Sequence, residues 1–216
     1  MLKIKICGLT RSRDIQIVNE LLPDYIGFVF APSKRQVTPQ QASKLKKLLR
    51  PEVKAVGVFV NAPIEQVVEL VKSRTIDIVQ LHGDEDVSYC QSLRQKVMVP
   101  IIKVIRLRNE ASLENMDAFD CDYFLFDTYV TGQYGGSGRQ IDVSILKGRE
   151  FTKPYFIAGG LNLQNVEAVL AEITPFAVDV SGGVETDGVK DKKKIADFIK
   201  AVRGRSEDDE QNTEGI

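Results

Sequence analysis

Short apolar runs alternate with amphipathic segments along almost the whole chain. The runs are rich in β-branched and aromatic residues and recur roughly every 22 to 32 residues, which is the length of a strand-plus-helix unit. This pattern predicts eight β-strands, at residues 2–6, 25–30, 53–60, 76–81, 99–104, 123–127, 155–158 and 176–180.

Helical periodicity fills the segments between these strands. Thr38 and Pro39 form an N-cap followed by proline at the first helical position, and Leu45, Leu48 and Leu49 are expected on the apolar face. Similar apolar faces are expected at residues 64–71, at 166–170 after a capping Asn162, and at 195–202. The weakest predicted helix lies at residues 141–146, because the loop before it is long and rich in glycine.

Strands that alternate with helices pair in parallel and connect through right-handed crossovers. An open doubly wound sheet is the alternative, but open sheets usually have fewer strands, and the first strand lacks the G-x-G-x-x-G turn of dinucleotide-binding folds. The pattern therefore predicts one α/β domain at residues 1–203, a (β/α)8 TIM barrel with a parallel eight-stranded core. Residues 204–216 are polar and acidic, and they predict a disordered tail.

Composition narrows the classes of function. The net charge of −1 gives no general attraction to nucleic acid or to anionic membranes, and no apolar stretch is long enough to span a bilayer. Three cysteines and one histidine in 216 residues argue against a disulfide framework and against a metal site. We therefore expect a cytoplasmic protein with no metal, no membrane and no obligate protein partner.

Polar and glycine residues replace the apolar runs where the predicted strands end. In a TIM barrel these ends gather at the face where active sites are built. Arg35, His82 and Asp179 are candidate substrate-binding residues on this basis. The full set of strand-end residues is Cys7, Phe30, Lys34, Arg35, Asn61, Gln80, Leu81, His82, Gly83, Arg106, Asp127, Thr128, Gly159, Gly160, Asp179, Val180, Ser181, Gly182 and Gly183.

The last two strand ends carry glycine pairs, Gly159-Gly160 and, after Ser181, Gly182-Gly183. Glycine lets backbone N–H groups approach an anion closely, and barrels commonly hold a phosphate between the loops after strands seven and eight. Such pairs can also be simple tight turns. Their presence at both of these strand ends favours a phosphate-binding site and hence a phosphorylated small-molecule substrate.

Cys7 and Asp127 are the candidate catalytic residues. Cys7 ends the first strand, and Asp127 ends an apolar run, where a lone carboxylate is costly unless it faces a pocket. A thiolate and a carboxylic acid across a barrel mouth suit proton shuttling, and a nearby cation can lower the pKa of a thiol. Cys7 could instead be a buried apolar filler, or a covalent nucleophile with His82 as its base.

Arg35 lies in the loop after the second strand. Its planar guanidinium could hold a substrate carboxylate through two hydrogen bonds. The alternative is a solvated loop charge.

Motifs at residues 5–10, 27–30, 33–35, 56–60, 80–83, 135–138, 159–161 and 178–181 occur together in one order along the chain. In this combination the chain resembles the phosphoribosylanthranilate isomerases of tryptophan biosynthesis, over residues 3 to about 202. The resemblance implies a cofactor-free Amadori rearrangement of an aminoaldose phosphate. It also implies that Asp127 is the general acid, Cys7 the general base and Arg35 the ligand of the anthranilate carboxylate.

The resemblance further implies phosphate loops at the two glycine pairs and a closing loop at residues 135–138. Gly182 departs from the family, which usually has a second serine there, and Val143 stands where the family has tryptophan. Two alternatives differ in the use of Cys7. Barrel isomerases of histidine biosynthesis use a carboxylate on the first strand, and a sugar-phosphate-binding regulatory protein would need neither Cys7 nor Asp127.

Overall fold

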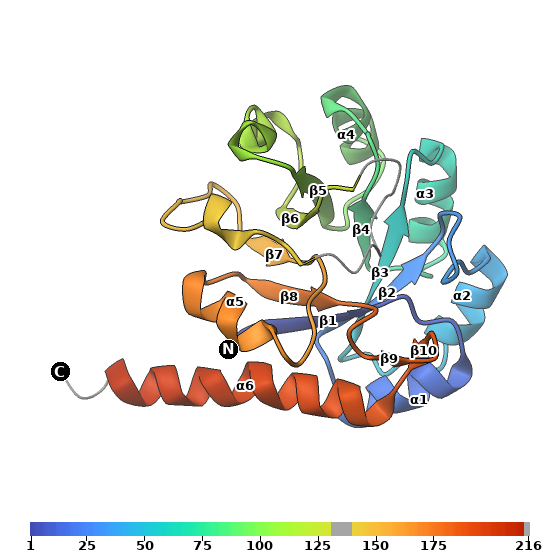
Figure 1. Cartoon of the computed structure of the whole chain (residues 1–216). Coiled ribbons are helices and arrows are strands. Elements are labelled where there is room, and N and C mark those ends of the chain that lie inside the picture. Colours follow the sequence, from blue (N-terminus) through green and yellow to red (C-terminus); the bar gives the residue numbers. More distant parts are fainter. Residues whose placement is uncertain (131–139, 214–216) are drawn as a thin grey trace.

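Eight parallel strands close into a barrel, which confirms the predicted fold (Figure 1). The computed structural model describes residues 1–130 and 140–213. Each strand pairs with the next along the chain, and the last pairs with the first. The strands are β1 (Lys3–Cys7), β2 (Tyr25–Val29), β3 (Lys54–Phe59), β4 (Ile78–Leu81), β5 (Ile101–Leu107), β6 (Tyr123–Thr128), β7 (Tyr155–Ile157) and β8 (Ala177–Val180).

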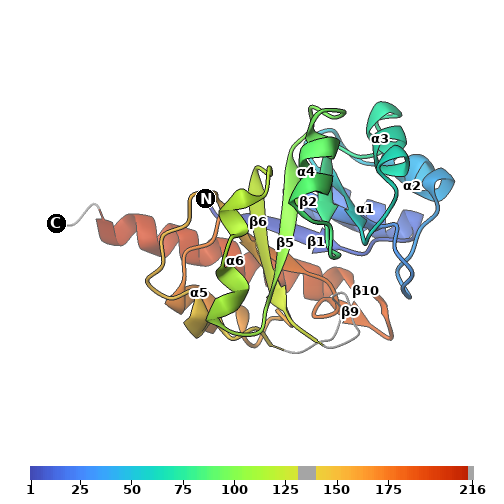
Figure 2. The same ribbon diagram turned by 90° about the horizontal axis from the view of Figure 1, so that it is seen from above.

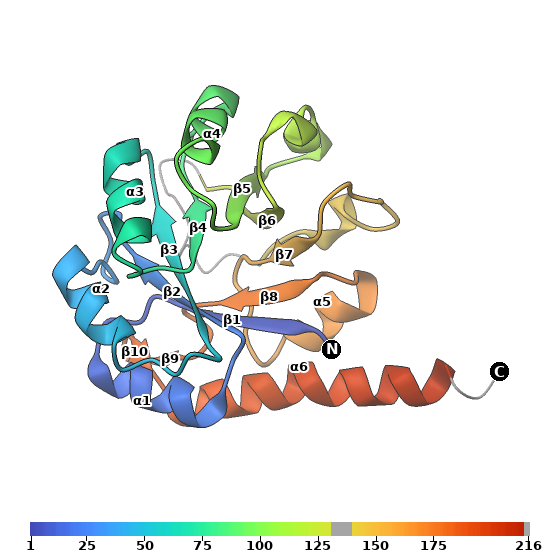
Figure 3. The ribbon, with the colours of Figure 1, turned by 180° about the vertical axis from the view of Figure 1, so that it is seen from behind.

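Helices cover the outside of the ring of strands, as the views from the front and from behind show (Figures 1 and 3). They are α1 (Ser12–Leu21), α2 (Pro39–Lys46), α3 (Ile64–Lys72), α4 (Val87–Arg94), α5 (Val166–Glu172) and α6 (Lys192–Thr213). The connection from β5 to β6 has the short 3-10 helices η1 (Glu110–Leu113) and η2 (Met116–Ala118). A small hairpin, β9 (Glu185–Thr186) and β10 (Val189–Lys190), lies between β8 and α6.

Local signals explain where most of these helices begin and end. The hydroxyl of Thr38 accepts a hydrogen bond from the Gln41 backbone N–H, so α2 begins as predicted. Its end differs from the prediction. Because α2 ends at Lys46, Leu48 lies beyond the helix and is 54 % exposed, whereas Leu45 and Leu49 are buried.

Two further details of the helix predictions are wrong. The N-cap of α5 is Asn165, and Asn162 lies in the preceding loop, where its side chain accepts a hydrogen bond from the Gln164 backbone N–H. The weakest predicted helix is only a 3-10 turn, η3 (Val143–Ile145), started by hydrogen bonds to Asp142.

The apolar core has two parts. The larger part lies between the strands and the helices and includes Ile4 and Ile6 of β1. The smaller part fills the inside of the barrel and consists of Val56, Ile78, Ile102, Val104, Leu125, Phe156, Ala158 and Ala177. Since side chains alternate along a strand, the neighbours of Ile4 and Ile6, namely Lys3, Lys5 and Cys7, face the inside.

The last helix, α6, runs along one side of the barrel and packs on α1 and α5 (Figures 1 and 2). It continues past residue 203 to Thr213, into the segment for which the sequence predicts a disordered tail. The boundary between barrel and tail stays a prediction. In the described part of the chain, no helix combines the length and the apolar character needed to cross a membrane.

Candidate active site

The predicted site residues come together at the carboxyl ends of the strands. Cys7 ends β1, Asp127 is the next-to-last residue of β6, and Asp179 lies in β8. His82 follows β4 directly, and Arg35 lies in the loop after β2. Strand alternation turns Cys7, His82, Asp127 and Asp179 toward the inside of the barrel, where the apolar filling ends.

The Cys7 thiol occupies a space left by a glycine of the neighbouring strand. Gly27 pairs with Cys7 in the β1–β2 register, and a Cβ atom at Gly27 would lie 2.6 Å from Cys7 Sγ. Burial raises the pKa of Cys7, and Lys5 opposes this shift without cancelling it. Lys5 and Lys190 both favour the thiolate, but the effect of burial on the pKa of Cys7 outweighs theirs.

Lys5 and Asp179 form an ion pair inside the barrel. Lys5 Nζ lies 2.7 Å from Asp179 Oδ2, and the two residues are partners in the β1–β8 register. Lys5 is completely buried, and Asp179 is 8 % exposed. The second carboxylate oxygen, Asp179 Oδ1, is buried and has no hydrogen-bond partner among the described residues. An unpaired buried acceptor at this position is suited to binding a substrate hydroxyl.

Asp127 is held by hydrogen bonds to both carboxyl oxygens. Oδ1 accepts from the Thr128 backbone N–H at 2.7 Å, and Oδ2 lies 3.1 Å from His82 Nε2. His82 Nδ1 lies in turn 2.9 Å from Gln80 Nε2, which can only donate. His82 Nδ1 is therefore an acceptor, and Nε2 carries the hydrogen that is donated to Asp127. The hydrogen-bonded series from Gln80 through His82 to Asp127 fixes the orientation of the Asp127 carboxyl group.

The loop that holds His82 is anchored by a buried charge pair. Lys103 Nζ lies 3.2 Å from Glu85 Oε2 and donates to the Gly83 carbonyl at 3.0 Å. Glu85 also accepts hydrogen bonds from the backbone N–H groups of Asn61 and Gly83. Both charged side chains are at most 3 % exposed. The strand ends of β3 and β4 are thus fixed relative to β5.

Arg35 is a bound residue rather than a solvated loop charge. Its Nε and Nη2 atoms donate to the two oxygens of Glu185 at 2.6 and 2.7 Å. Lys190 Nζ donates to the same carboxylate at 2.7 Å and to the Ser181 carbonyl at 3.0 Å. Burial alone would raise the pKa of Glu185, but the hydrogen bonds from Arg35 and Lys190 outweigh it and lower the pKa to about 2.

The two glycine loops lie against each other. A Cβ atom at Gly183 would lie 2.0 Å from the Leu161 carbonyl oxygen, and residues 162 and 183 form a β-bridge. Gly159 and Gly160 both have positive φ angles, +89° and +64°, which favour glycine. Ser181 Oγ donates to the Cys7 carbonyl at 3.0 Å and so joins the second loop to β1. The backbone forms one continuous cradle beside Cys7.

Four residues of this site have no role in the sequence prediction: Lys5, Gln80, Glu185 and Lys190, of which Gln80 stands among the predicted strand-end residues. Lys5 and Gln80 each stand two residues before a predicted site residue, on the same strand face. Lys190 is brought back by the β9–β10 hairpin, whose turn is Asp187-Gly188, a dipeptide typical of tight hairpins. The closing loop expected at residues 135–138 lies outside the described residues.

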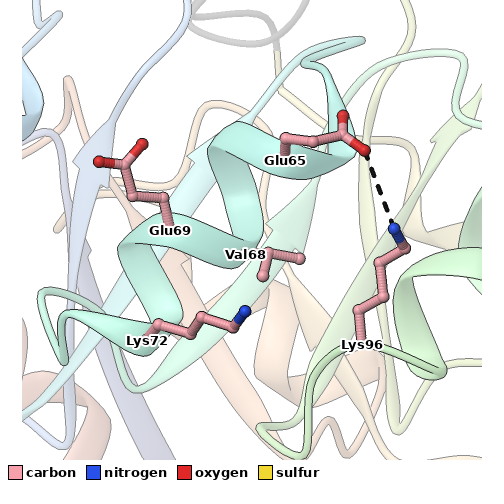
Figure 4. A pocket seen from close by; sticks show the side chains of 5 residues that line it. All are labelled: Glu65, Val68, Glu69, Lys72 and Lys96. Carbon is pink, nitrogen blue, oxygen red and sulfur yellow. Dashed lines mark ion pairs between the residues drawn. The ribbon is translucent and has the colours of Figure 1, made fainter.

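A hollow on the outer side of α3 is separate from this site (Figure 4). It has a volume of about 550 Å³, and its lining includes Glu65 and Lys96, which are 3.8 Å apart. These two side chains are 80 % and 51 % exposed, as expected for a solvated helix surface. The hollow has no residue in common with the strand ends. Among the described residues, acidic, histidine and cysteine side chains do not gather in threes that could hold a metal ion.

A (β/α)8 barrel that holds an acid, a thiol and two glycine loops at its active face defines a class of enzyme acting on small phosphorylated molecules. The sequence matches the family model described as "N-(5'phosphoribosyl)anthranilate (PRA) isomerase" over residues 4–201. The chain therefore belongs to the phosphoribosylanthranilate isomerase family, and it is an isomerase of tryptophan biosynthesis. This confirms the resemblance found in the sequence.

Relatives with this name are similar over nearly their whole length. The chain is 46 % identical over 204 residues to N-(5'-phosphoribosyl)anthranilate isomerase of Thermoanaerobacter pseudethanolicus, covering 94 % of this chain and 99 % of the relative. For the Streptococcus mutans enzyme the identity is 42 % over 203 residues, covering 94 % of this chain and all of the relative.

Solved structures of the family have the same fold. The Thermotoga maritima enzyme superimposes with a TM-score of 0.84 at 35 % identity, covering 94 % of this chain and 100 % of that one. A further family structure, with a TM-score of 0.80 and the same identity and coverage, is a complex with reduced 1-(o-carboxyphenylamino)-1-deoxyribulose 5-phosphate. Another Thermotoga structure is described as monomers made from a dimeric enzyme, so the expectation of no obligate protein partner stays a prediction.

Proposed function

We propose that this chain converts N-(5'-phosphoribosyl)anthranilate into 1-(2-carboxyphenylamino)-1-deoxyribulose 5-phosphate, with Asp127 as the general acid and Cys7 as the general base. The observation that carries this proposal is the placement of the two groups. Both face the inside of the barrel at strand ends, on β1 and β6, which stand three places apart in the closed ring. The complex of a family member with a reduced form of the product supports the choice of substrate.

Asp127 would begin the reaction by protonating the ring oxygen of the ribose. The carbon–oxygen bond of the ring then breaks, its electron pair stays on the oxygen, and the anthranilate nitrogen forms an iminium with C1′. The hydrogen bonds from His82 and from the Thr128 backbone fix the plane of the carboxyl group. A carboxyl group fixed in this way meets the ring oxygen without a reorientation step.

Cys7 would complete the isomerisation by removing the proton from C2′. The electron pair of the broken C–H bond neutralises the iminium and gives an enolamine, which tautomerises to the ketone. One proton enters at the ring oxygen and one leaves from C2′, so the overall change needs no oxidant and no cofactor.

The remaining predicted residues would bind the two ends of the substrate. Glu185 occupies the Nε and Nη2 atoms of Arg35, and the remaining edge of the guanidinium is proposed to hold the anthranilate carboxylate. His82 and Asp179 would contact the sugar. The loops with Gly159, Gly160, Ser181, Gly182 and Gly183 would hold the phosphate through backbone N–H groups, which do not require the serine that Gly182 replaces.

The test is a fluorescence time course with N-(5'-phosphoribosyl)anthranilate generated in situ. Wild type should consume the fluorescent substrate rapidly, and Cys7→Ser and Asp127→Asn should each lose at least about a hundredfold in kcat, the usual contribution of a general acid or base. Cys121→Ala is the matched control, because this buried cysteine lies outside the site, and it should keep its turnover. Turnover that survives in Cys7→Ser would show that another group is the base. A folded wild type without turnover would reject the function.

A further inference from the structure

Lys5 is an unusual residue for the inside of a barrel. It is completely buried, and the filling of the barrel just below it is apolar. A buried ammonium is costly unless it is paired, and replacing buried ion pairs by apolar residues often leaves a protein equally stable. Packing alone therefore gives no reason for a lysine here, and the reason is to be sought in what its charge touches.

The charge of Lys5 touches two groups of the active site. Lys5 stands two residues before Cys7 on β1, so the two side chains point to the same side, with their Cα atoms roughly 6.6 Å apart. The ammonium is held by Asp179 at 2.7 Å, and Cys7 is the second acidic group that interacts with its charge. Burial lowers the pKa of Lys5, but Asp179 and Cys7 together raise it by more, so Lys5 stays charged.

Four charged groups on four different segments interact electrostatically with the Cys7 thiol. Lys5 belongs to β1, Asp179 to β8 and Lys190 to β10, while Arg35 lies in the loop after β2. Among the charged groups, Lys5 has the largest effect and lowers the pKa of Cys7. Asp179 comes next and raises this pKa, and Lys190 follows and lowers it. Asp179 therefore has two opposing effects on Cys7: it repels a thiolate, and it keeps the ammonium in place beneath the sulfur.

We propose that Lys5 is a positioning residue for the base: its ammonium, fixed by Asp179, stabilises the thiolate of Cys7 inside the barrel. The proposal rests on the proposed role of Cys7 in the isomerisation. Lys5 transfers no proton. It stays positively charged while Cys7 changes from thiolate to thiol on taking the C2′ proton. The pair Lys5–Asp179 is thus an almost completely buried counter-charge.

The test measures the thiol without substrate. Alkylation of Cys7 by iodoacetamide is followed as a function of pH, and peptide mass spectrometry separates Cys7 from the other two cysteines. Lys5→Met should move the midpoint of the alkylation profile up by at least about one pH unit, which is tenfold less thiolate at a given pH. Asp179→Asn should move it down, because Cys7 then becomes the remaining anion beside Lys5.

Lys3 provides the matched control. It is on the same strand and the same face, and it pairs with Asp24 at 2.8 Å, but its side chain is 43 % exposed and lies far from Cys7. Lys3→Met should leave the midpoint unchanged. Lys5→Met leaves Asp179 buried without its partner and can unfold the chain, so the double variant Lys5→Met/Asp179→Asn removes both charges. Its midpoint should also lie above that of wild type, because the effect of Lys5 exceeds that of Asp179.

An unchanged midpoint in the folded double variant would overturn the proposal, as would a shift of Lys5→Met and Asp179→Asn in the same direction. The pH profile of kcat/KM should move with the alkylation midpoint in each active variant. These results are separate from those for the isomerisation itself, because the alkylation needs no turnover. If Cys7→Ser kept its activity, the base would be wrong while the measured effect of Lys5 on the thiol stood.

Discussion

Glu185 joins Arg35 to Lys190, and its charge should have a measurable effect on stability. It accepts hydrogen bonds from Arg35 at 2.6 and 2.7 Å and from Lys190 at 2.7 Å. The side chains of Arg35, Glu185 and Lys190 are 12 %, 5 % and 1 % exposed, so water screens these contacts weakly. The informative perturbation is Glu185→Gln, which keeps the shape of the side chain and removes its charge.

The size of the effect follows from the pKa of Glu185, which falls from 4.5 to about 2 in the folded protein. A difference of this size corresponds to about 3 kcal/mol of folding free energy at most. Because the amide oxygen of the glutamine can still accept a hydrogen bond from Arg35 or Lys190, we expect about half of it, roughly 1.5 kcal/mol. The folded pKa is the lower one, so this stabilisation is complete above about pH 4.5 and is lost as the pH falls toward 2.

Urea denaturation of wild type and Glu185→Gln at pH 7 and pH 3 measures this difference. The variant should be less stable by roughly 1.5 kcal/mol at pH 7, and the gap should shrink to less than half at pH 3. Glu65→Gln is the control, since its carboxylate is 80 % exposed and lies 3.8 Å from its partner, and it should change little at either pH. A gap of equal size at both pH values would refute the electrostatic reasoning.

Three further outcomes test other parts of the site. His82 is the only histidine of the chain, so ¹⁵N NMR should show one imidazole with a hydrogen on Nε2, and a hydrogen on Nδ1 would contradict the contact with Gln80. Lys103→Met should cost about 3–5 kcal/mol in urea denaturation, because it leaves a buried carboxylate unpaired, whereas Lys96→Met at an exposed pair should cost under about 0.5 kcal/mol. Gly183→Ala should raise the KM for the substrate several-fold by forcing the glycine loops apart, while Gly182→Ala, whose Cβ would meet only Arg35 Nη2 at 3.5 Å, should leave it within about twofold.

The sequence was sufficient to predict the barrel because each strand is short, apolar and followed by a polar or glycine residue. All eight predicted strands are present, most of them shifted by one to three residues at an end. The strand ends also identified Cys7, His82, Asp127 and Asp179 as neighbours in space, since parallel strands end at one face. No contact between side chains was needed for these predictions.

Contacts between distant parts of the chain could not be predicted in this way. Glu185 and Arg35 are separated by 150 residues, and Lys5 and Asp179 by 174. Nothing in the sequence near Arg35 indicates that a hairpin after β8 brings a carboxylate to it. The error at Leu48 has a local cause. The periodicity continues past Lys46, but the helix does not, and the leucine turns toward solvent.

Strand alternation supplies a rule that assigns a place in the site to two of the four residues without a predicted role, Lys5 and Gln80. In a barrel, the residue two positions before an inward site residue also faces inward, one layer deeper. At β1 this is Lys5 below Cys7, and at β4 it is Gln80 below His82. In both cases the deeper residue is polar and at most 1 % exposed; Gln80 contacts His82 directly, and Lys5 acts on Cys7 through its charge.

Strand β6 is the exception, and it shows why the deeper layer matters. Leu125 lies one layer deeper than Asp127 and belongs to the apolar filling of the barrel. Strand β6 therefore places no polar side chain beneath the Asp127 carboxyl group. The support comes sideways instead, from His82 of the β4 end, and His82 is oriented by Gln80 beneath it. The proposed base, Cys7, is thus supported from its own strand and the proposed acid, Asp127, from another. A single substitution at Gln80 should therefore disturb Asp127 without a direct contact, while Cys7 should depend on Lys5 alone among its strand neighbours.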